Sequence, residues 1–189
     1  ESAARGHDTL MMTPNELRAG LLALAKRSVT IMTACTNEES TKLYLVLPFL
    51  GLLGYDYANP YEVYPEHTAD LITGSQNKIN FAILRDGVPV IAVECKQAGA
   101  DLEAGREQLR CYFNMLADVK LGILTNGILF EFFVDSAEPN IMDAEPFLTI
   151  DLEMIARAGI SEEAIEALIS ATKGTYDPET IAEAAHVQL

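Results

Sequence analysis

The first part of the chain carries two segments with apolar side chains at helical spacing. Residues 13–16, Thr-Pro-Asn-Glu, combine a capping threonine, a proline suited to the first helical turn and a glutamate that can complete a capping box. This pattern predicts a helix that ends near Thr33. Residues 36–54 repeat the signal with Glu39 at the capping-box position, and they follow the period of a second helix, which Pro48 should bend.

The middle of the chain changes to the patterns of strands. A short strand is predicted over residues 69–72, and a hairpin is predicted over residues 79–84 and 88–96 with an Arg-Asp-Gly turn between its strands. Residues 90–93 are apolar at every position, which is typical of a strand that is covered on both faces. The second strand of the hairpin is therefore predicted to lie in the centre of a sheet.

A further helical pattern opens at Asp101. Its apolar stripe consists of Leu102, Leu109, Tyr112, Phe113 and Leu116. Strands are predicted over residues 119–125 and 128–134, joined by an Asn-Gly turn signal, and residues 147–152 lead into three short helices. This order of helices and strands predicts an α/β fold.

The composition excludes several classes of protein. Hydrophobic residues make up 49% of the 189 residues, which is enough to build a core and excludes a disordered chain. There are 13 basic and 28 acidic residues, and the resulting net charge of -15 excludes a broad electropositive surface for nucleic acid. The longest apolar run, residues 43–55, is too short to cross a bilayer, so we expect no membrane partner and a cytoplasmic location.

The most informative segment is the end of the predicted central strand. Glu94 and Lys96 stand two residues apart, so they project from the same side of a strand that is otherwise apolar. Buried charges need a partner, water or a metal ion, although a simple ion pair at the rim of the sheet explains the pattern about equally well. The hairpin can bring Asn80 beside Glu94, and the preceding helix can add Glu38 or Glu39.

The choice between the two helix glutamates stays open. Glu39 occupies the predicted capping-box position, yet it also lies four residues before Leu43 and so points along the inward stripe. Glu38 faces solvent unless the end of the helix turns it toward the sheet.

Several short motifs follow one another between residues 36 and 152. They are Asn-Glu-Glu-Ser-Thr-Lys at 37–42, Leu-Pro-Phe-Leu at 47–50, Leu-Gly-Tyr-Asp at 53–56, Pro-Glu-His-Thr-Ala-Asp at 65–70, Lys-Ile-Asn-Phe-Ala-Ile at 78–83, Val-Glu-Cys-Lys at 93–96 and Gly-Ile-Leu-Thr-Asn-Gly at 122–127. Together they resemble the PD-(D/E)XK nuclease superfamily, and in particular the N-terminal nuclease-like domain of type I restriction enzyme R subunits. The helical tail through Ala185 also looks similar to such proteins.

This resemblance implies a restriction-endonuclease-like core in which a helix, three strands, a helix and a strand build a mixed central sheet. We therefore expect three parts of the chain. Residues 1–35 form a lead-in and an extra N-terminal helix, residues 36–152 form the nuclease-like domain, and residues 153–189 form a helical extension.

The resemblance also implies a metal site. In the superfamily an aspartate of the hairpin and the glutamate of the E-x-K motif hold Mg²⁺, for which Mn²⁺ can substitute, and the lysine positions the attacking water. Glu94 and Lys96 match that motif, and the carbonyl of Cys95 is a further expected ligand. The aspartate position holds Asn80, whose neutral amide should weaken Mg²⁺ binding, so we expect impaired catalysis, or no cofactor at all if the site is degenerate. Asp70 is the nearest acid that could replace the missing ligand, although it could also simply cap a turn.

Gln108 and Tyr112 resemble a Q-x-x-x-Y motif that supports DNA contact or site geometry in some nucleases of this superfamily. Their spacing places both residues on one face of the predicted helix, and Arg106 and Arg110 form a second such pair beside them. Tyr112 also belongs to the apolar stripe, so it could be a core residue.

Two functions follow as hypotheses. The first is a Mg²⁺-dependent DNA endonuclease domain of a restriction system. The second is a non-catalytic relative, which could be prophage-borne, acting as a DNA-binding or protein-interaction module. Residues 51–150 contain 15 acidic and 6 basic residues, a difference of -9, so we expect the isolated domain to bind DNA weakly. Restriction-modification subunits are the other expected partners.

Overall fold

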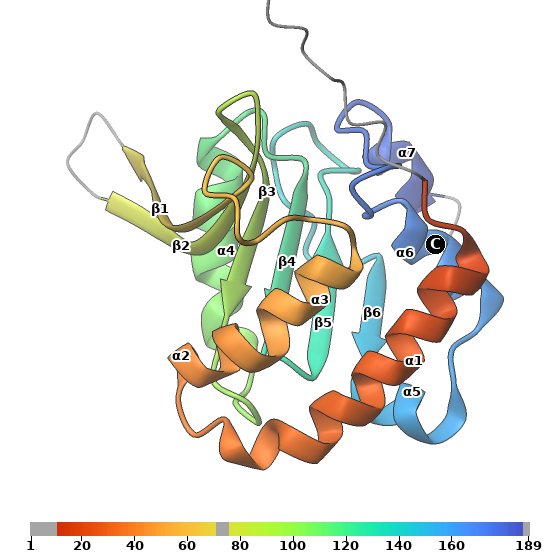
Figure 1. The fold of residues 1–189 in the computed structure, drawn as a ribbon. Helices are drawn as coiled ribbons and strands as arrows, with labels where there is room; N and C mark the ends of the chain where they lie inside the picture. Colours follow the sequence, from red (N-terminus) through yellow and green to blue (C-terminus); the bar gives the residue numbers. More distant parts are fainter. Residues whose placement is uncertain (1–10, 71–75, 187–189) are drawn as a thin grey trace, which may run out of the picture.

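The computed structural model describes residues 11–70 and 76–186, which form an α/β fold around a six-stranded mixed sheet (Figure 1). The strands lie in the order in which they occur in the chain. They are β1 (Val63–Asp70), β2 (Gln76–Arg85), β3 (Val88–Cys95), β4 (Leu121–Thr125), β5 (Leu129–Phe133) and β6 (Leu148–Asp151). The central pair of β3 and β4 is parallel, and each other neighbouring pair is antiparallel.

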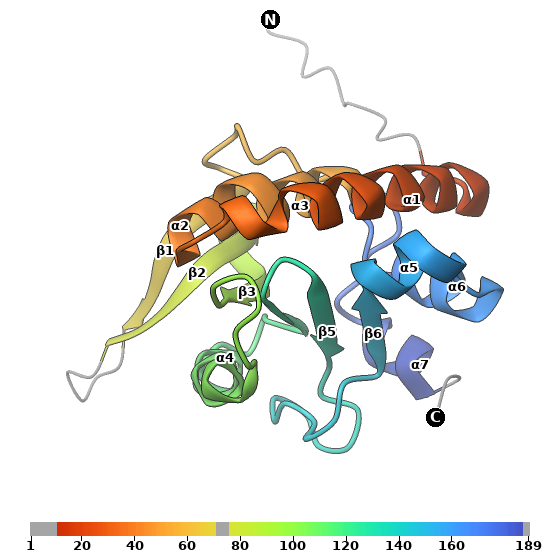
Figure 2. The same ribbon diagram turned by 90° about the horizontal axis from the view of Figure 1, so that it is seen from below.

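Helices cover both faces of the sheet and one of its edges (Figure 2). They are α1 (Pro14–Ile31), α2 (Glu38–Thr41), α3 (Leu47–Leu52), α4 (Glu103–Met115), α5 (Leu152–Ala158), α6 (Glu162–Ile169) and α7 (Ile181–His186), with a 3₁₀ turn η1 (Met32–Ala34) and a π-helical segment η2 (Lys42–Val46). The first three helices lie on one face, α4 lies on the other, and α5 to α7 gather beside β6. Among the described residues, no helix has the length and apolar character needed to cross a membrane.

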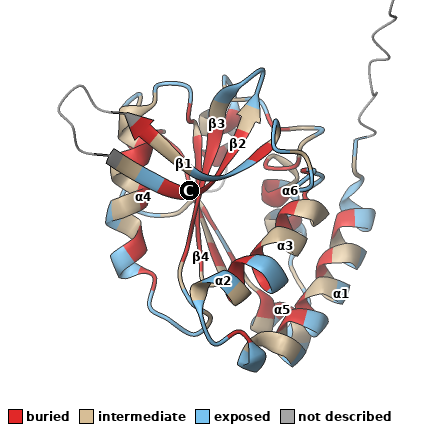
Figure 3. Cartoon of the chain, turned by 60° about the vertical axis from the view of Figure 1, so that its left-hand side comes forward, coloured by how far each residue is buried: buried red, intermediate tan, exposed pale blue. Residues whose placement is uncertain are grey.

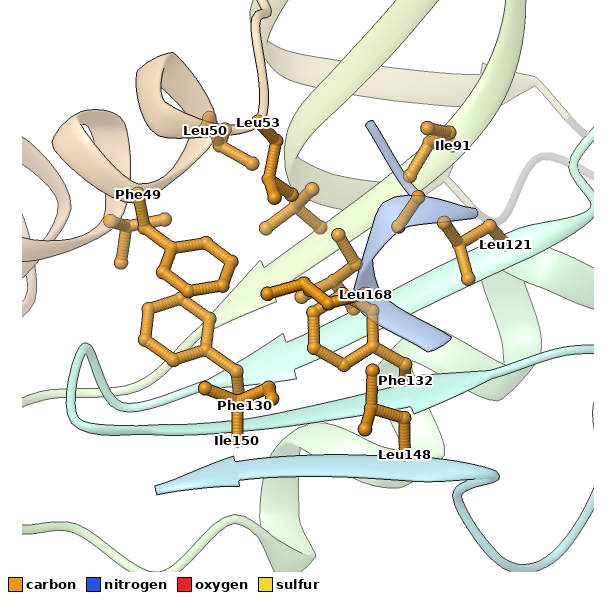
Figure 4. Close-up of a cluster of buried hydrophobic side chains, with 14 of the residues drawn as sticks. Phe49, Leu50, Leu53, Ile91, Leu121, Phe130, Phe132, Leu148, Ile150 and Leu168 are labelled. Atoms are coloured by element: carbon orange, nitrogen blue, oxygen red, sulfur yellow. The ribbon is translucent and has the colours of Figure 1, made fainter. Parts of the chain in front are cut away.

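The two faces of the sheet bury separate sets of apolar side chains. In Figure 3 the buried residues appear as red segments along the strands. On the face covered by α1 and α3, the ring of Phe49 stacks on that of Phe130 with centroids 3.9 Å apart (Figure 4). This larger cluster also includes Leu168 of α6 and Ile181 of α7, so the helical tail packs on the sheet. The smaller cluster under α4 includes most of the predicted stripe, and Leu109 is wholly buried there.

Three local predictions are confirmed. Thr13 and Glu16 form the expected capping box of α1. The turn between β2 and β3 places Asp86 and Gly87 at φ angles of 52° and 79°, which matches a tight hairpin turn. Gly127, in the turn between β4 and β5, has a φ of 81°, a conformation that glycine adopts without strain.

The start of the second helix differs from the prediction. Asn37 caps α2 and forms a capping box with Ser40, so the expected start at residue 36 with Glu39 in the capping box is wrong. Asn37 is the cap because its side-chain oxygen accepts a hydrogen bond from the backbone N–H of Ser40. In return, the Ser40 hydroxyl oxygen accepts one from the backbone N–H of Asn37.

Pro48 affects this helix in an unexpected way. Proline has no N–H to donate to the carbonyl four residues earlier, which is that of Tyr44. The Arg27 guanidinium of α1 donates to this carbonyl instead, at 3.0 Å. The turn before Pro48 is the π-helical segment η2, so the helix adds a wide turn here.

The first strand also begins earlier than predicted. β1 starts at Val63 and contains Pro65, because it lies at the edge of the sheet, where a missing N–H leaves no ladder bond unmade. The predicted strand 69–72 overlaps only its end, and residues 71 and 72 lie outside the described part of the chain. β2 starts at Gln76, three residues before the predicted start at residue 79.

Candidate functional site

Glu94 and Lys96 meet at the carboxyl end of β3. Glu94 lies in the strand and is only 1% exposed, while the Lys96 side chain is 21% exposed. The Lys96 ammonium donates to Glu94 Oε1 at 2.8 Å. The other carboxylate oxygen, Oε2, is buried and has no hydrogen-bond partner. The end of β3 therefore holds a buried ion pair with one unsatisfied oxygen.

Asn80 of β2 joins this pair from the neighbouring strand. Its amide oxygen accepts a hydrogen bond from the backbone N–H of Cys95 at 2.7 Å. Its amide nitrogen donates to Glu38 Oε1 at 3.1 Å. The Cys95 N–H can only donate and the ionised Glu38 carboxylate can only accept, so the orientation of the buried Asn80 amide is fixed.

Glu38 is the helix glutamate that reaches the site. It is the first residue of α2 and half-buried, and it comes from the turn that Asn37 caps. Glu39 is exposed and pairs with Lys42, whose ammonium also contacts Glu66 of β1. With Asn37 as the cap, Glu38 is the first helical residue and lies against Asn80, while Glu39 points to solvent.

Burial dominates the electrostatics of the site. It raises the pKa of Glu94 from 4.5 to about 7, and Lys96 opposes this shift by stabilising the charged carboxylate. The Glu38 carboxylate raises this pKa further, so the two acids are close enough to repel each other. Burial also raises the pKa of the Cys95 thiol well above its ordinary value of 9.0, which keeps the thiol neutral.

Helix α4 holds the lysine from the other side. Gln108 Oε1 lies 3.4 Å from the Lys96 ammonium, and Gln108 Nε2 donates to the backbone carbonyl of Lys78 at 2.8 Å. Gly105 leaves room for the lysine chain, because a Cβ atom there would lie 2.9 Å from Lys96 Cε. Gly105 is not among the predicted site residues, although a glycine three residues before Gln108 on a helix was the available signal.

The other residue of the Q-x-x-x-Y pattern lies in the core. Tyr112 is wholly buried in the cluster under α4. Its hydroxyl lies 2.7 Å from Nδ1 of His67 in β1. The structure thus brings Gln108 to Lys96 but places Tyr112 beneath the edge of the sheet.

The two arginines of α4 do not lie beside the site as expected. Arg106 pairs with Glu131 of β5 at 2.9 Å, and Arg110 pairs with Glu107 on the helix surface at 3.2 Å. Arg106 precedes Gln108 by two residues, which is more than half a helical turn, so it points toward β5 and not toward Lys96. The side chain of Asp70 lies outside the described part of the chain.

The donor set fits a resident Mg²⁺ poorly. Mg²⁺ prefers several oxygen ligands in an octahedral arrangement. Glu94 Oε2 is available, but the Asn80 oxygen is neutral and already accepts a hydrogen bond from the Cys95 N–H, and the Asn80 nitrogen faces Glu38. The structure therefore presents an amide N–H where the resemblance implies a carboxylate ligand. Within the described ranges, no three or more Asp, Glu, His or Cys side chains form a group suited to a metal ion.

Comparisons of the chain with models of known protein families, with curated proteins and with solved structures found no match.

Proposed function

We propose that this chain is a nuclease-like domain of the PD-(D/E)XK kind, similar to the N-terminal domain of type I restriction enzyme R subunits. It acts on DNA in the cytoplasm, and its Mg²⁺-dependent hydrolysis of phosphodiester bonds is impaired. The observation that carries the proposal is the meeting of Glu94, Lys96, Asn80 and Glu38 at one end of β2 and β3. The order of a helix, three antiparallel strands, helix α4 and a strand parallel to β3 supports the expected core.

The chemistry of these groups suits a phosphodiester. The Lys96 ammonium is held by Glu94 and Gln108 yet remains partly exposed, so it can donate to a phosphate oxygen or to a water molecule. Glu94, with its pKa raised to about 7, can accept a proton near neutral pH. A bound Mg²⁺ would supply charge neutralisation at the phosphate. Without it, Glu38 and Glu94 together outweigh the one ammonium group and repel the anion, which accounts for the impairment.

A second candidate function is a non-catalytic module that binds other subunits of a restriction-modification system. The observation in its favour is that basic side chains of the α4 region already have acidic partners. Lys78 pairs with Glu66, and Arg106 pairs with Glu131. Phosphate contacts supply most of the affinity of proteins for duplex DNA, and paired cations supply less of it.

The test measures binding and cleavage together. A fluorescent duplex at low salt reports binding by anisotropy, and a supercoiled plasmid with Mn²⁺ or Mg²⁺ reports nicking. We expect weak, salt-sensitive binding, almost no cleavage by the wild type, and weak nicking by Asn80→Asp that disappears when Glu94→Ala is added. Robust wild-type cleavage that depends on Glu94 would overturn the impairment, and no binding at low salt would favour the protein-interaction module.

A further inference from the structure

We infer that the amide of Asn80 takes the place of a divalent cation, so that the site is held in shape by hydrogen bonds of the chain itself. This role rests on the proposed function, because the relationship to metal-dependent nucleases is what leads one to expect a cation here. It adds a specific role for the contact between Asn80 and Glu38, which the nuclease resemblance does not supply.

The geometry shows why an amide is needed at this position. The backbone N–H of Cys95 cannot rotate, so it requires an acceptor in the Asn80 side chain. Glu38 Oε1 requires a donor from the same side chain, 3.1 Å away. A carboxamide provides both groups, whereas an ionised carboxylate provides only acceptors. An aspartate here would turn an oxygen toward the Glu38 carboxylate.

The charges of the site lead to the same conclusion. With Asn80, the cluster contains the Glu38 and Glu94 carboxylates and the Lys96 ammonium, and the amide N–H and the ammonium each serve one carboxylate. With aspartate, three carboxylates would share one ammonium group in a partly buried space. Such a cluster binds a cation or loses stability, because unpaired like charges repel strongly where water is scarce.

Thermal unfolding in EDTA and with added Mn²⁺ tests this role without measuring activity. We expect the wild type to show the same unfolding midpoint in both. Asn80→Asp should lower the midpoint in EDTA by about 5 °C, because it replaces a charge-assisted hydrogen bond by repulsion, and Mn²⁺ should restore most of the loss. Asn77→Asp is the matched control, since it adds the same charge to β2 at a side chain that contacts Met115. It should show no Mn²⁺ response.

A double variant provides the decisive comparison. Glu38→Gln combined with Asn80→Asp exchanges the amide and the carboxylate, so it keeps the total charge and allows the hydrogen bond to form in the opposite direction. We expect it to recover stability in EDTA and to respond less to Mn²⁺ than Asn80→Asp alone.

Two results would overturn the inference. One is a Mn²⁺-induced rise of the wild-type midpoint that Glu94→Ala abolishes, because the natural site would then bind a cation. The other is a double variant as unstable as Asn80→Asp, or one that also fails to fold, because the amide and carboxylate would then not be exchangeable. Neither result depends on DNA, so a failure of the proposed nuclease function would be recognised separately.

Discussion

Replacing Glu94 by glutamine should make the protein more stable at alkaline pH and leave its stability almost unchanged at acidic pH. The Glu94 carboxylate is buried at the end of β3, and one of its oxygens has no hydrogen-bond partner. Burial therefore destabilises the charged carboxylate by more than the ion pair with Lys96 stabilises it, and the pKa of Glu94 is raised from 4.5 to about 7. Glutamine has nearly the same shape and carries no charge at any pH.

The sign and size of the effect follow from this pKa. The folded state holds the Glu94 proton more tightly than the unfolded chain does. The contribution of this proton to the stability of the fold is therefore complete below pH 4.5 and is lost as the pH rises through 7. A rise from 4.5 to about 7 corresponds to about 3 kcal/mol in the free energy of unfolding. At pH 8, Glu94→Gln should recover part of this free energy. The recovery is only partial because Lys96 loses its ion pair, although water can hydrate the exposed end of its side chain.

Urea unfolding of the wild type and of Glu94→Gln at pH 5 and pH 8 measures the effect as a difference at each pH, so other titrating groups largely cancel. Glu107→Gln is the control, because it makes the same chemical change at an exposed ion pair of α4 and should alter stability by less than about 0.5 kcal/mol. A Glu94→Gln variant that is destabilised equally at both pH values would refute the reasoning, since the buried carboxylate would then carry no titration penalty.

Two further substitutions probe the surroundings of the site. Gly105→Ala would place a Cβ atom 2.6 Å from Leu124 Cδ1 and 2.9 Å from Lys96 Cε, so it should lower stability at every pH and also push Lys96 away from Glu94. Because Lys96 lowers the Glu94 pKa, unfolding measurements should then show a steeper loss of stability between pH 5 and pH 8 than in the wild type. Gly122→Ala, which also crowds the α4 interface, should lower stability uniformly, and an unchanged pH dependence in Gly105→Ala would contradict the positioning role. Tyr112→Phe should keep the core packed and cost about 1 kcal/mol through loss of the hydroxyl contact with His67, as measured by denaturant unfolding, whereas a loss of several kcal/mol would show that the hydroxyl does more.

Features that depend on neighbouring residues in the sequence were predictable. The capping box of α1 and the hairpin turn after Arg85 follow from backbone preferences of a few adjacent residues. The central place of β3 was predictable as well, because residues 90–93 are apolar at every position, which is typical of a strand covered on both faces. Which of two adjacent capping residues begins a helix was not predictable. Thr36 and Asn37 can both cap, and α2 uses Asn37.

Contacts between distant segments account for most of the differences. The π-helical turn before Pro48 leaves the Tyr44 carbonyl to Arg27, which lies on another helix and donates to the group that the proline cannot serve. Arg106 was expected to support the site, but a glutamate on β5 is its partner. A sequence pattern gives the face on which a charged side chain lies, and only the fold decides which opposite charge it meets.

Asn80 shows how these two levels combine. The proposed nuclease relationship predicts a carboxylate at this position, and an asparagine there should bind Mg²⁺ less well. The fold adds that the amide nitrogen faces Glu38, because the Cys95 N–H takes the oxygen. Compared with an aspartate at this position, asparagine has one carboxylate oxygen fewer to offer a cation, and it donates an N–H to the Glu38 carboxylate that an aspartate would repel. Asn80→Asp alone should accordingly make the stability of the fold depend on a cation, whether or not it also produces cleavage of DNA.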